Sequence, residues 1–107
     1  MPPVRHDTRI YPGETFETVV QVGDDLTGWS AVLQVRRGRI PRTVVATLNS
    51  IDDDEITVTS AGRITVRLPA TFTINMPSGR YVYDLDLHGP TGDVRRILSG
   101  VVTVRRR

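Results

Sequence analysis

The chain has 107 residues, a net charge of +2 from 14 Arg against 12 Asp and Glu, and neither Lys nor Cys. The length corresponds to one domain of ordinary size, and the lack of Cys excludes disulfides and thiolate zinc sites. Because bases and acids are interspersed and nearly balanced, the charge pattern gives no nucleic-acid signature.

β-Branched residues dominate the composition, since Val, Ile and Thr together supply 35 of the 107 residues. Such side chains favour strands, so we predict an all-β domain. The longest apolar runs contain two or three residues, which predicts no membrane-spanning segment, and the first residues lack the apolar stretch of a secretory signal. We expect a single domain over 1–107, with 1–8 as an extended N-terminal arm.

Alternation of apolar and polar residues recurs along the chain and predicts short strands. In chain order, the expected strands cover 5–11 as an edge strand, then 15–22, 29–36, 43–48, 56–59, 63–68, 80–88 and 94–104. Turn residues rich in Gly, Pro and Asp separate them. About seven or eight short strands at this spacing predict an antiparallel sandwich or barrel.

Two segments depart from this regular pattern. Residues 69–74 lack turn glycines, so we expect one short helical turn there that crosses between the sheets. The last predicted strand is partly apolar on both faces, and Gly100 within it predicts a β-bulge.

Two aromatic residues each have two interpretations. Tyr81 follows Gly79-Arg80 at the start of a strand, just after the crossing segment. It fits either an ordinary half-buried strand tyrosine or the tyrosine corner of an immunoglobulin-like sandwich, in which the hydroxyl ties down the crossing segment. Trp29 alternates with Ala31 and Leu33, which favours a core position over a surface contact residue.

Two carboxylates, Asp84 and Asp86, share one face of a predicted strand at a separation of ~7 Å. Paired carboxylates can hydrolyse glycosides. The turn before Val94 would pair that residue with Leu87. Asp86 would then lie opposite Arg95 and form a solvated cross-strand ion pair, which is the favoured interpretation.

The remaining polar residues form no recognised catalytic or metal motif. The acidic run Asp52-Asp53-Asp54-Glu55 lacks the pattern of a calcium loop, so a solvated turn is favoured over a calcium site. His6 and His88 stand apart from any set of metal ligands. There is no Gly-x-Ser-x-Gly sequence and no phosphate-binding loop. We therefore expect no enzyme, no cofactor and no metal site.

The candidate partner-contact residues are arginines around Gly38, in a predicted loop, and at the C-terminus. They are Arg36, Arg37, Arg39, Arg42, Arg105, Arg106 and Arg107. A solvated loop, a contact with an acidic protein surface and a contact with phosphates are the alternatives for the loop. No aromatic residue interleaves it, which disfavours single-stranded nucleic acid. A frayed basic tail is the favoured interpretation of the C-terminal run.

Two stretches of the chain resemble small virion domains of tailed phages. The first runs from Gly13-Glu14-Thr15-Phe16 through Asp25-Leu26-Thr27-Gly28 to Arg36, and the second runs from Gly79-Arg80-Tyr81 to Val104. The N-terminal domain of phage baseplate upper proteins is similar. The Asp-Leu-Thr-Gly turn also has a structural reason, because Asp can cap it, Leu can enter the core and Gly permits its backbone angle.

The resemblance implies an immunoglobulin-like antiparallel β-sandwich and a role in assembly, without catalytic residues. The chain would be a stand-alone virion adaptor, assembled in the host bacterial cytoplasm, that docks fibre, spike or receptor-binding proteins at the tail, baseplate or neck. A capsid decoration protein and a receptor- or carbohydrate-binding module are the alternatives. The implied partners are other virion proteins in a symmetric multicopy assembly, with neither a membrane nor nucleic acid involved.

Overall fold

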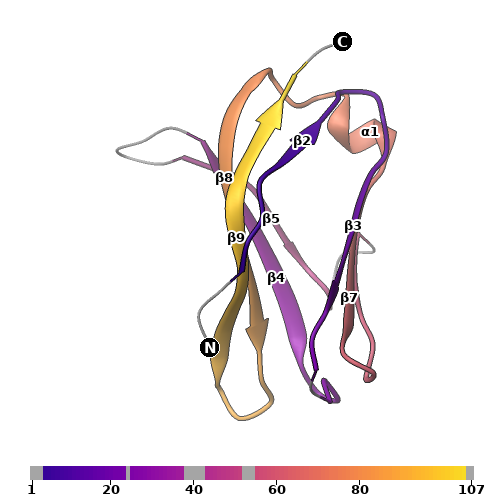
Figure 1. The fold of residues 1–107 in the computed structure, drawn as a ribbon, viewed down its shortest axis with the longest axis vertical. Coiled ribbons are helices and arrows are strands. Elements are labelled where there is room, and N and C mark those ends of the chain that lie inside the picture. Colours follow the sequence, from indigo (N-terminus) through magenta and orange to yellow (C-terminus); the bar gives the residue numbers. More distant parts are fainter. Residues whose placement is uncertain (1–3, 24, 38–42, 52–54, 106–107) are drawn as a thin grey trace.

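Two β-sheets face each other in the computed structural model, which describes residues 4–23, 25–37, 43–51 and 55–105 (Figure 1). Sheet A has the order β1-β9-β8-β4-β5, with β2 also paired to β9, and sheet B has the order β3-β7-β6. The strands of sheet A are β1 Val4–Arg5, β2 Thr8–Ile10, β4 Ser30–Arg37, β5 Thr43–Asn49, β8 Gly79–His88 and β9 Val94–Val104. Those of sheet B are β3 Phe16–Gln21, β6 Ile56–Val58 and β7 Arg63–Leu68.

The strand order identifies the fold. Strands β9, β8, β4 and β5 occupy the places of G, F, C and C′ in a variable-type immunoglobulin sandwich, and β3, β7 and β6 occupy those of B, E and D. The predicted immunoglobulin-like antiparallel β-sandwich is therefore confirmed. The predicted strands also lie where expected, with ends that differ by one or a few residues, except that the edge strand expected over 5–11 is divided into β1 and β2.

A short helix crosses from sheet B to sheet A, as the sequence predicts for 69–74. Helix α1 spans Ala70–Thr73 and connects β7 to β8. The hydroxyl of Tyr81 donates a hydrogen bond of 2.6 Å to the carbonyl of Pro77, in the connection that follows α1. Tyr81 is therefore a tyrosine corner, because its ring is buried in the core while its hydroxyl fixes the crossing segment. No helix in the part of the chain that the structure describes could span a membrane.

The turn from Asp25 to Gly28 has the structure that its residue types predict. A carboxylate oxygen of Asp25 accepts hydrogen bonds from the Thr27 amide at 2.9 Å and from the Thr27 hydroxyl at 2.6 Å. These bonds lower the pKa of Asp25, the hydroxyl contributing most. Leu26 is buried, and Gly28 has a φ of 81°, in the region that favours glycine.

Alternate residues of the central strands point into the core. On β8, Tyr81, Tyr83, Leu85 and Leu87 are all buried, and on β4 the buried residues are Ala31, Leu33 and Val35. Burial at every second residue is what the period of a strand requires of a sheet covered on one face. The residues between them lie on the outer face of sheet A.

The first strands of the chain pair in parallel with its last strand. Val4 lies opposite Leu98 and Thr8 lies opposite Val102, so β1 and β2 both add to the β9 edge of sheet A. Between them the chain passes close over Gly100. A Cβ on Gly100 would lie 2.0 Å from the carbonyl oxygen of His6, so only glycine fits at this position.

The expected bulge at Gly100 is wrong. Gly100 lies in register opposite Tyr83, and the irregularity in the β8–β9 pair falls between Leu85 and Asp86. Leu85 faces Leu98 and Asp86 faces Arg96, so Ile97 is the extra residue. The glycine serves the close approach of the N-terminal chain, and a sequence cannot distinguish this role from a bulge by residue type alone.

We predict that Gly100→Ala dislodges β1 and β2 and lowers the free energy of unfolding by roughly 1–3 kcal/mol, because the added methyl meets backbone. Urea unfolding measures the loss, and hydrogen exchange shows where it occurs. Gly23→Ala is the matched control, since an added Cβ there has no atom within 4 Å. Equal stability of the two variants would contradict the close approach.

Candidate functional site

The outer face of sheet A combines exposed valines with charged side chains. Val44 is 50% exposed and lies beside Arg36, and Val94 at the far end of the face is 57% exposed. Val32, Val82 and Val101 are partly exposed on the same face. Arginines outnumber aspartates on it: Arg36, Arg80 and Arg96 lie with Asp84 and Asp86 on β4, β8 and β9. In addition, Arg9 on β2 lies opposite Thr103, which faces Arg80. The face therefore carries apolar area and a small excess of positive charge.

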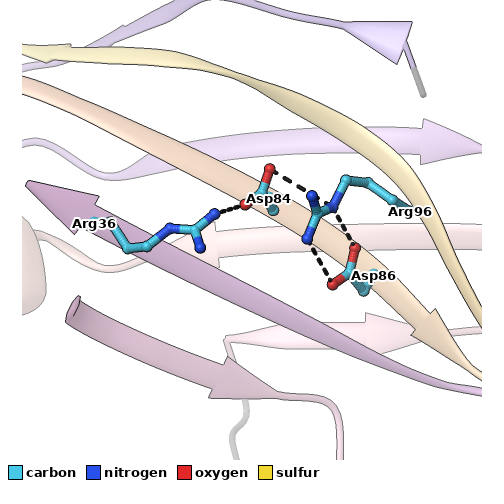
Figure 2. Close-up of polar contacts among 4 residues, drawn as sticks. All are labelled: Arg36, Asp84, Asp86 and Arg96. Carbon is cyan, nitrogen blue, oxygen red and sulfur yellow. Dashed lines mark hydrogen bonds and ion pairs between the residues drawn. The ribbon is translucent and has the colours of Figure 1, made fainter. Parts of the chain in front are cut away.

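Four of these charged residues form one network across three strands (Figure 2). Arg36 on β4 forms an ion pair with Asp84 on β8. Arg96 on β9 approaches the other oxygen of Asp84, with 3.7 Å between Nε and Oδ1. The same guanidinium donates to both oxygens of Asp86, at 3.0 and 3.5 Å. Cation and anion thus alternate along the network, in the order Arg36, Asp84, Arg96 and Asp86.

Asp84 is the least exposed member of the network. Only 12% of its side chain is accessible, compared with 22% for Asp86, 26% for Arg36 and 50% for Arg96. Its Oδ2 and the Nε of Arg36 are buried, and neither has a hydrogen-bond partner among the described residues. The ion pair with Arg36 is therefore the contact that compensates the buried Oδ2 of Asp84. A carboxylate so placed is stable only while its cationic partners stay in position.

The predicted pairing of Asp86 with Arg95 is wrong. The turn between β8 and β9 is one residue shorter than predicted, so His88 rather than Leu87 faces Val94 and Asp86 faces Arg96. The two aspartates share a face as expected. A glycosidase would require both carboxylates to face an open cleft. Here both carboxylates are neutralised by arginine instead.

The structure separates Arg36 from Arg37. Arg36 lies on the outer face of sheet A, whereas the guanidinium carbon of Arg37 lies 5.5 Å from the centre of the Tyr81 ring. Arg37 also donates to the carbonyl of Ser78 at 3.4 Å, so it covers the tyrosine corner. Arg105 is exposed, and its amide bonds to the carbonyl of Ile10. The other arginines predicted as contact residues lie outside the described residues, namely Arg39, Arg42, Arg106 and Arg107.

The described residues contain no group of three or more His, Asp and Glu side chains that could hold a metal ion. Asp52, Asp53 and Asp54 of the acidic run lie outside that description, and Glu55 is partly buried. His6 and His88 are exposed at separate places, on the segment between β1 and β2 and at the end of β8. The geometry therefore brings no candidate ligands together in the described part of the chain.

All six aromatic side chains lie within the described residues, and none is fully exposed. Tyr81 and Tyr83 are buried. Trp29 packs against the core, as its alternation with Ala31 predicts, and a Cβ on Gly89 would lie 3.0 Å from its ring. The other three are partly buried, namely Tyr11, Phe16 and Phe72. The domain consequently presents no flat aromatic platform of the kind that stacks on sugars.

A cavity of about 360 Å³ lies between the two sheets. Its deeper walls are apolar and come from both sheets, including Leu33, Leu48, Val66, Leu68, Leu85 and Val102. No pattern in the sequence indicates this cavity, because its size depends on how far apart the two sheets lie.

Thr73 fixes α1 at one end of this cavity. Its buried hydroxyl donates to the carbonyl of Glu14 at 2.8 Å and accepts from the amide of Gly13 at 3.1 Å. These two bonds tie the crossing helix to the connection between β2 and β3. Phe72 and Met76, on either side of Thr73, are part of the cavity wall.

Tyr83 links β8 to the N-terminal chain. Its hydroxyl donates to the carbonyl of His6, across the position of Gly100. Burial and, to a smaller extent, the negative charge of Asp7 raise the pKa of Tyr83 to about 12. The pKa of Asp7 is itself lowered, mainly because the amide of Val101 donates to its carboxylate at 2.9 Å.

Comparison with known proteins adds little to this geometry. No family model matches the chain, and no curated protein matches it. One similar solved structure is the extracellular domain of the voltage-gated sodium channel β4 subunit, described as a parallel homodimer with a role in cell–cell adhesion. The TM-score is 0.49 at 12% sequence identity, over 96% of this chain and 92% of that chain. The assignment of the fold therefore rests on strand order and the tyrosine corner.

We predict that Asp84→Asn lowers the free energy of unfolding by about 2 kcal/mol, because it leaves Arg36 partly buried without a counter-charge. Asp86→Asn is the matched control and costs under ~1 kcal/mol, because its partner is half exposed. Urea unfolding at neutral pH measures both values. A larger loss for Asp86→Asn would contradict the central place of Asp84.

We also predict that the stability of the domain depends on the ionisation of Tyr83 at high pH. An unfolded tyrosine ionises near pH ~10, whereas the pKa of Tyr83 in the folded protein is about 12. The folded state therefore holds more protons between these values, and stability falls as pH rises through them. Tyr83→Phe should lose less stability than the natural chain between about pH 9 and 11.5, as measured by urea unfolding. Identical pH slopes would refute this assignment.

Proposed function

We propose that the chain is a non-enzymatic structural protein of a tailed-phage virion. It acts as an adaptor that docks fibre, spike or receptor-binding proteins at the tail, baseplate or neck. The observation that carries the docking role is the outer face of sheet A, where the arginine–aspartate network lies among exposed valines. The virion placement is supported by the resemblance of residues 13–36 and 79–104 to small phage virion domains.

The outer face of sheet A suits a protein partner with an acidic surface. Arg96 is half exposed and Arg80 is exposed, so both can pair with carboxylates of a partner. The network holds Arg96 in place before binding, which reduces the entropy lost when an interface forms. Around it, Val44 and Val94 offer apolar area of the kind found in the centre of interfaces.

A rigid sandwich is a suitable adaptor because its two sheets fix the geometry of everything attached to them. Strand β5 ends sheet A, and β3 and β6 end sheet B, so these edges are also available for strand addition by a neighbour. Many copies in a symmetric assembly would each present the same face at the same angle. The virion, assembled in the host cytoplasm, is the location that this proposal implies.

The main alternative is a capsid decoration protein, which would use the same face on a head protein. A carbohydrate- or receptor-binding module is less well supported, because none of the six aromatic side chains is fully exposed. Glycan-array binding by the purified chain would favour that module over the adaptor.

We predict that peptides of this chain occur in the tail fraction of purified phage particles that encode it. Mass spectrometry of particles separated into heads and tails makes the measurement. Peptides in the head fraction alone would favour decoration of the capsid over the adaptor. Absence from both fractions would overturn the virion proposal altogether.

The docking face has its own test in a matched pair of variants. Val44 and Val19 are exposed to 50% and 51%, but Val44 lies on the outer face of sheet A and Val19 on that of sheet B. We expect Val44→Glu to reduce incorporation into particles about tenfold or more, a loss of the size that one interface residue can cause. Val19→Glu should be incorporated normally. The reverse result would place the interface on sheet B.

A further inference from the structure

We propose that the cavity between the two sheets is a binding site for an uncharged, apolar small molecule, such as an aromatic hydrocarbon or an aliphatic chain. The cavity measures about 360 Å³. This is more than twice the ~150 Å³ of an engineered apolar cavity that stays dry and takes up benzene. The site lies inside the sandwich, so it is separate from the docking face of sheet A, and the inference does not rest on the proposed function.

The chemistry of the walls defines the class of ligand. Most of the lining residues are aliphatic or aromatic, and no Asp, Glu or Arg is among them. Burial of a charged group without a partner is costly, so the walls exclude an ionised ligand. Tyr83 also lines the cavity, and its hydroxyl is bonded to the carbonyl of His6. A ligand in the interior therefore gains affinity mainly through apolar contact with the walls.

Apart from Tyr83, the polar lining residues lie where the cavity approaches the surface. His6 is exposed, Thr8 and Thr18 are partly exposed, and Thr71 on α1 and Asn75 just after it are exposed. Their hydroxyl, amide and imidazole groups can hydrogen-bond to one neutral polar group at the end of a ligand. Such a pattern, with an apolar interior and a few polar groups, is typical of small-molecule sites.

The walls are held in place before any ligand binds. Thr73 ties α1 to the β2–β3 connection through two hydrogen bonds, and Tyr81 ties the following segment to β8. The cavity therefore cannot be closed by a simple movement of α1 without breaking these bonds. A preformed site spares its ligand the cost of ordering the protein.

An added protein strand explains the cavity less well than a small molecule. Strand β3 ends sheet B, and a strand beside it would project side chains towards Thr8, Phe16 and Thr18. The cavity extends further, to Val35 on β4 and to Ala46 and Leu48 on β5, at the other end of sheet A. Alternate side chains of one strand do not reach across that width, whereas a small molecule can occupy it.

The test uses the intact chain and N-phenyl-1-naphthylamine, a neutral apolar dye whose fluorescence rises in apolar surroundings. We expect saturable binding of one dye per chain with a blue-shifted emission. Ala46→Phe fills the cavity from β5 and should weaken binding about tenfold or more. Thr47→Phe is the matched control, since Thr47 is exposed on the outer face of the same strand, and it should leave the affinity unchanged. An anionic analogue, 8-anilinonaphthalene-1-sulfonate, should bind about tenfold or more weakly than the neutral dye.

Several results would overturn the proposal. The absence of saturable binding would do so, as would equal affinity for Ala46→Phe and Thr47→Phe. Loss of near-UV circular dichroism with uptake of both dyes would show a loosened core instead of a site. Dye uptake that falls as the chain self-associates would show that a second copy fills the cavity. If Ala46→Phe does not fold, Ala46→Leu replaces it and the rise in Tm on addition of benzene replaces the dye measurement. The proposal predicts a rise in Tm for the natural chain and a smaller rise for Ala46→Leu.

Discussion

The parallel pairing of β1 and β2 with β9 is the constraint on which much of the structure depends. It places the N-terminal chain in sheet A, which leaves β3 at the end of a three-stranded sheet B. It also requires Gly100, because His6 passes where a side chain would stand, and it brings the carbonyl of His6 to the hydroxyl of Tyr83. The cavity lies between sheet A, whose edge is formed by the N-terminal strands, and sheet B, whose edge is formed by β3.

The inner and outer faces of strands β4, β8 and β9 have different roles. The inner face supplies the buried apolar residues that make the domain stable, and the outer face holds Asp84 between Arg36 and Arg96. Because the same backbone carries both, packing of the core fixes the backbone positions from which the charged side chains project. A partner that docks on this face therefore meets charges already in place, at little cost in side-chain entropy.

The sequence predicts the elements well and the contacts between them less well. Strand limits, the helical turn, the tyrosine corner and the Asp25 turn follow from local patterns of alternation and turn chemistry. The pairing of Asp86 with Arg96 was not predicted, because it depends on where the turn begins, and His88 rather than Leu87 is the β8 residue that faces Val94. The contact of Arg36 with Asp84 needs the neighbours of each strand in the sheet, and the cavity needs the distance between sheets. Neither the order of the strands in a sheet nor the distance between the sheets can be predicted from a local sequence pattern.

The closing of sheet A by the two ends of the chain also bears on how the domain is made. Val4 and Leu98 are partners, so the loop that their pairing closes spans almost the whole sequence. Contacts between residues so far apart in the sequence form slowly, because the entropy of the long loop is lost before the contact contributes any stabilisation. During synthesis the first strands leave the ribosome long before β9 exists. The N-terminal chain therefore stays unpaired until β9 has been synthesised, and sheet A is complete only after that strand has emerged.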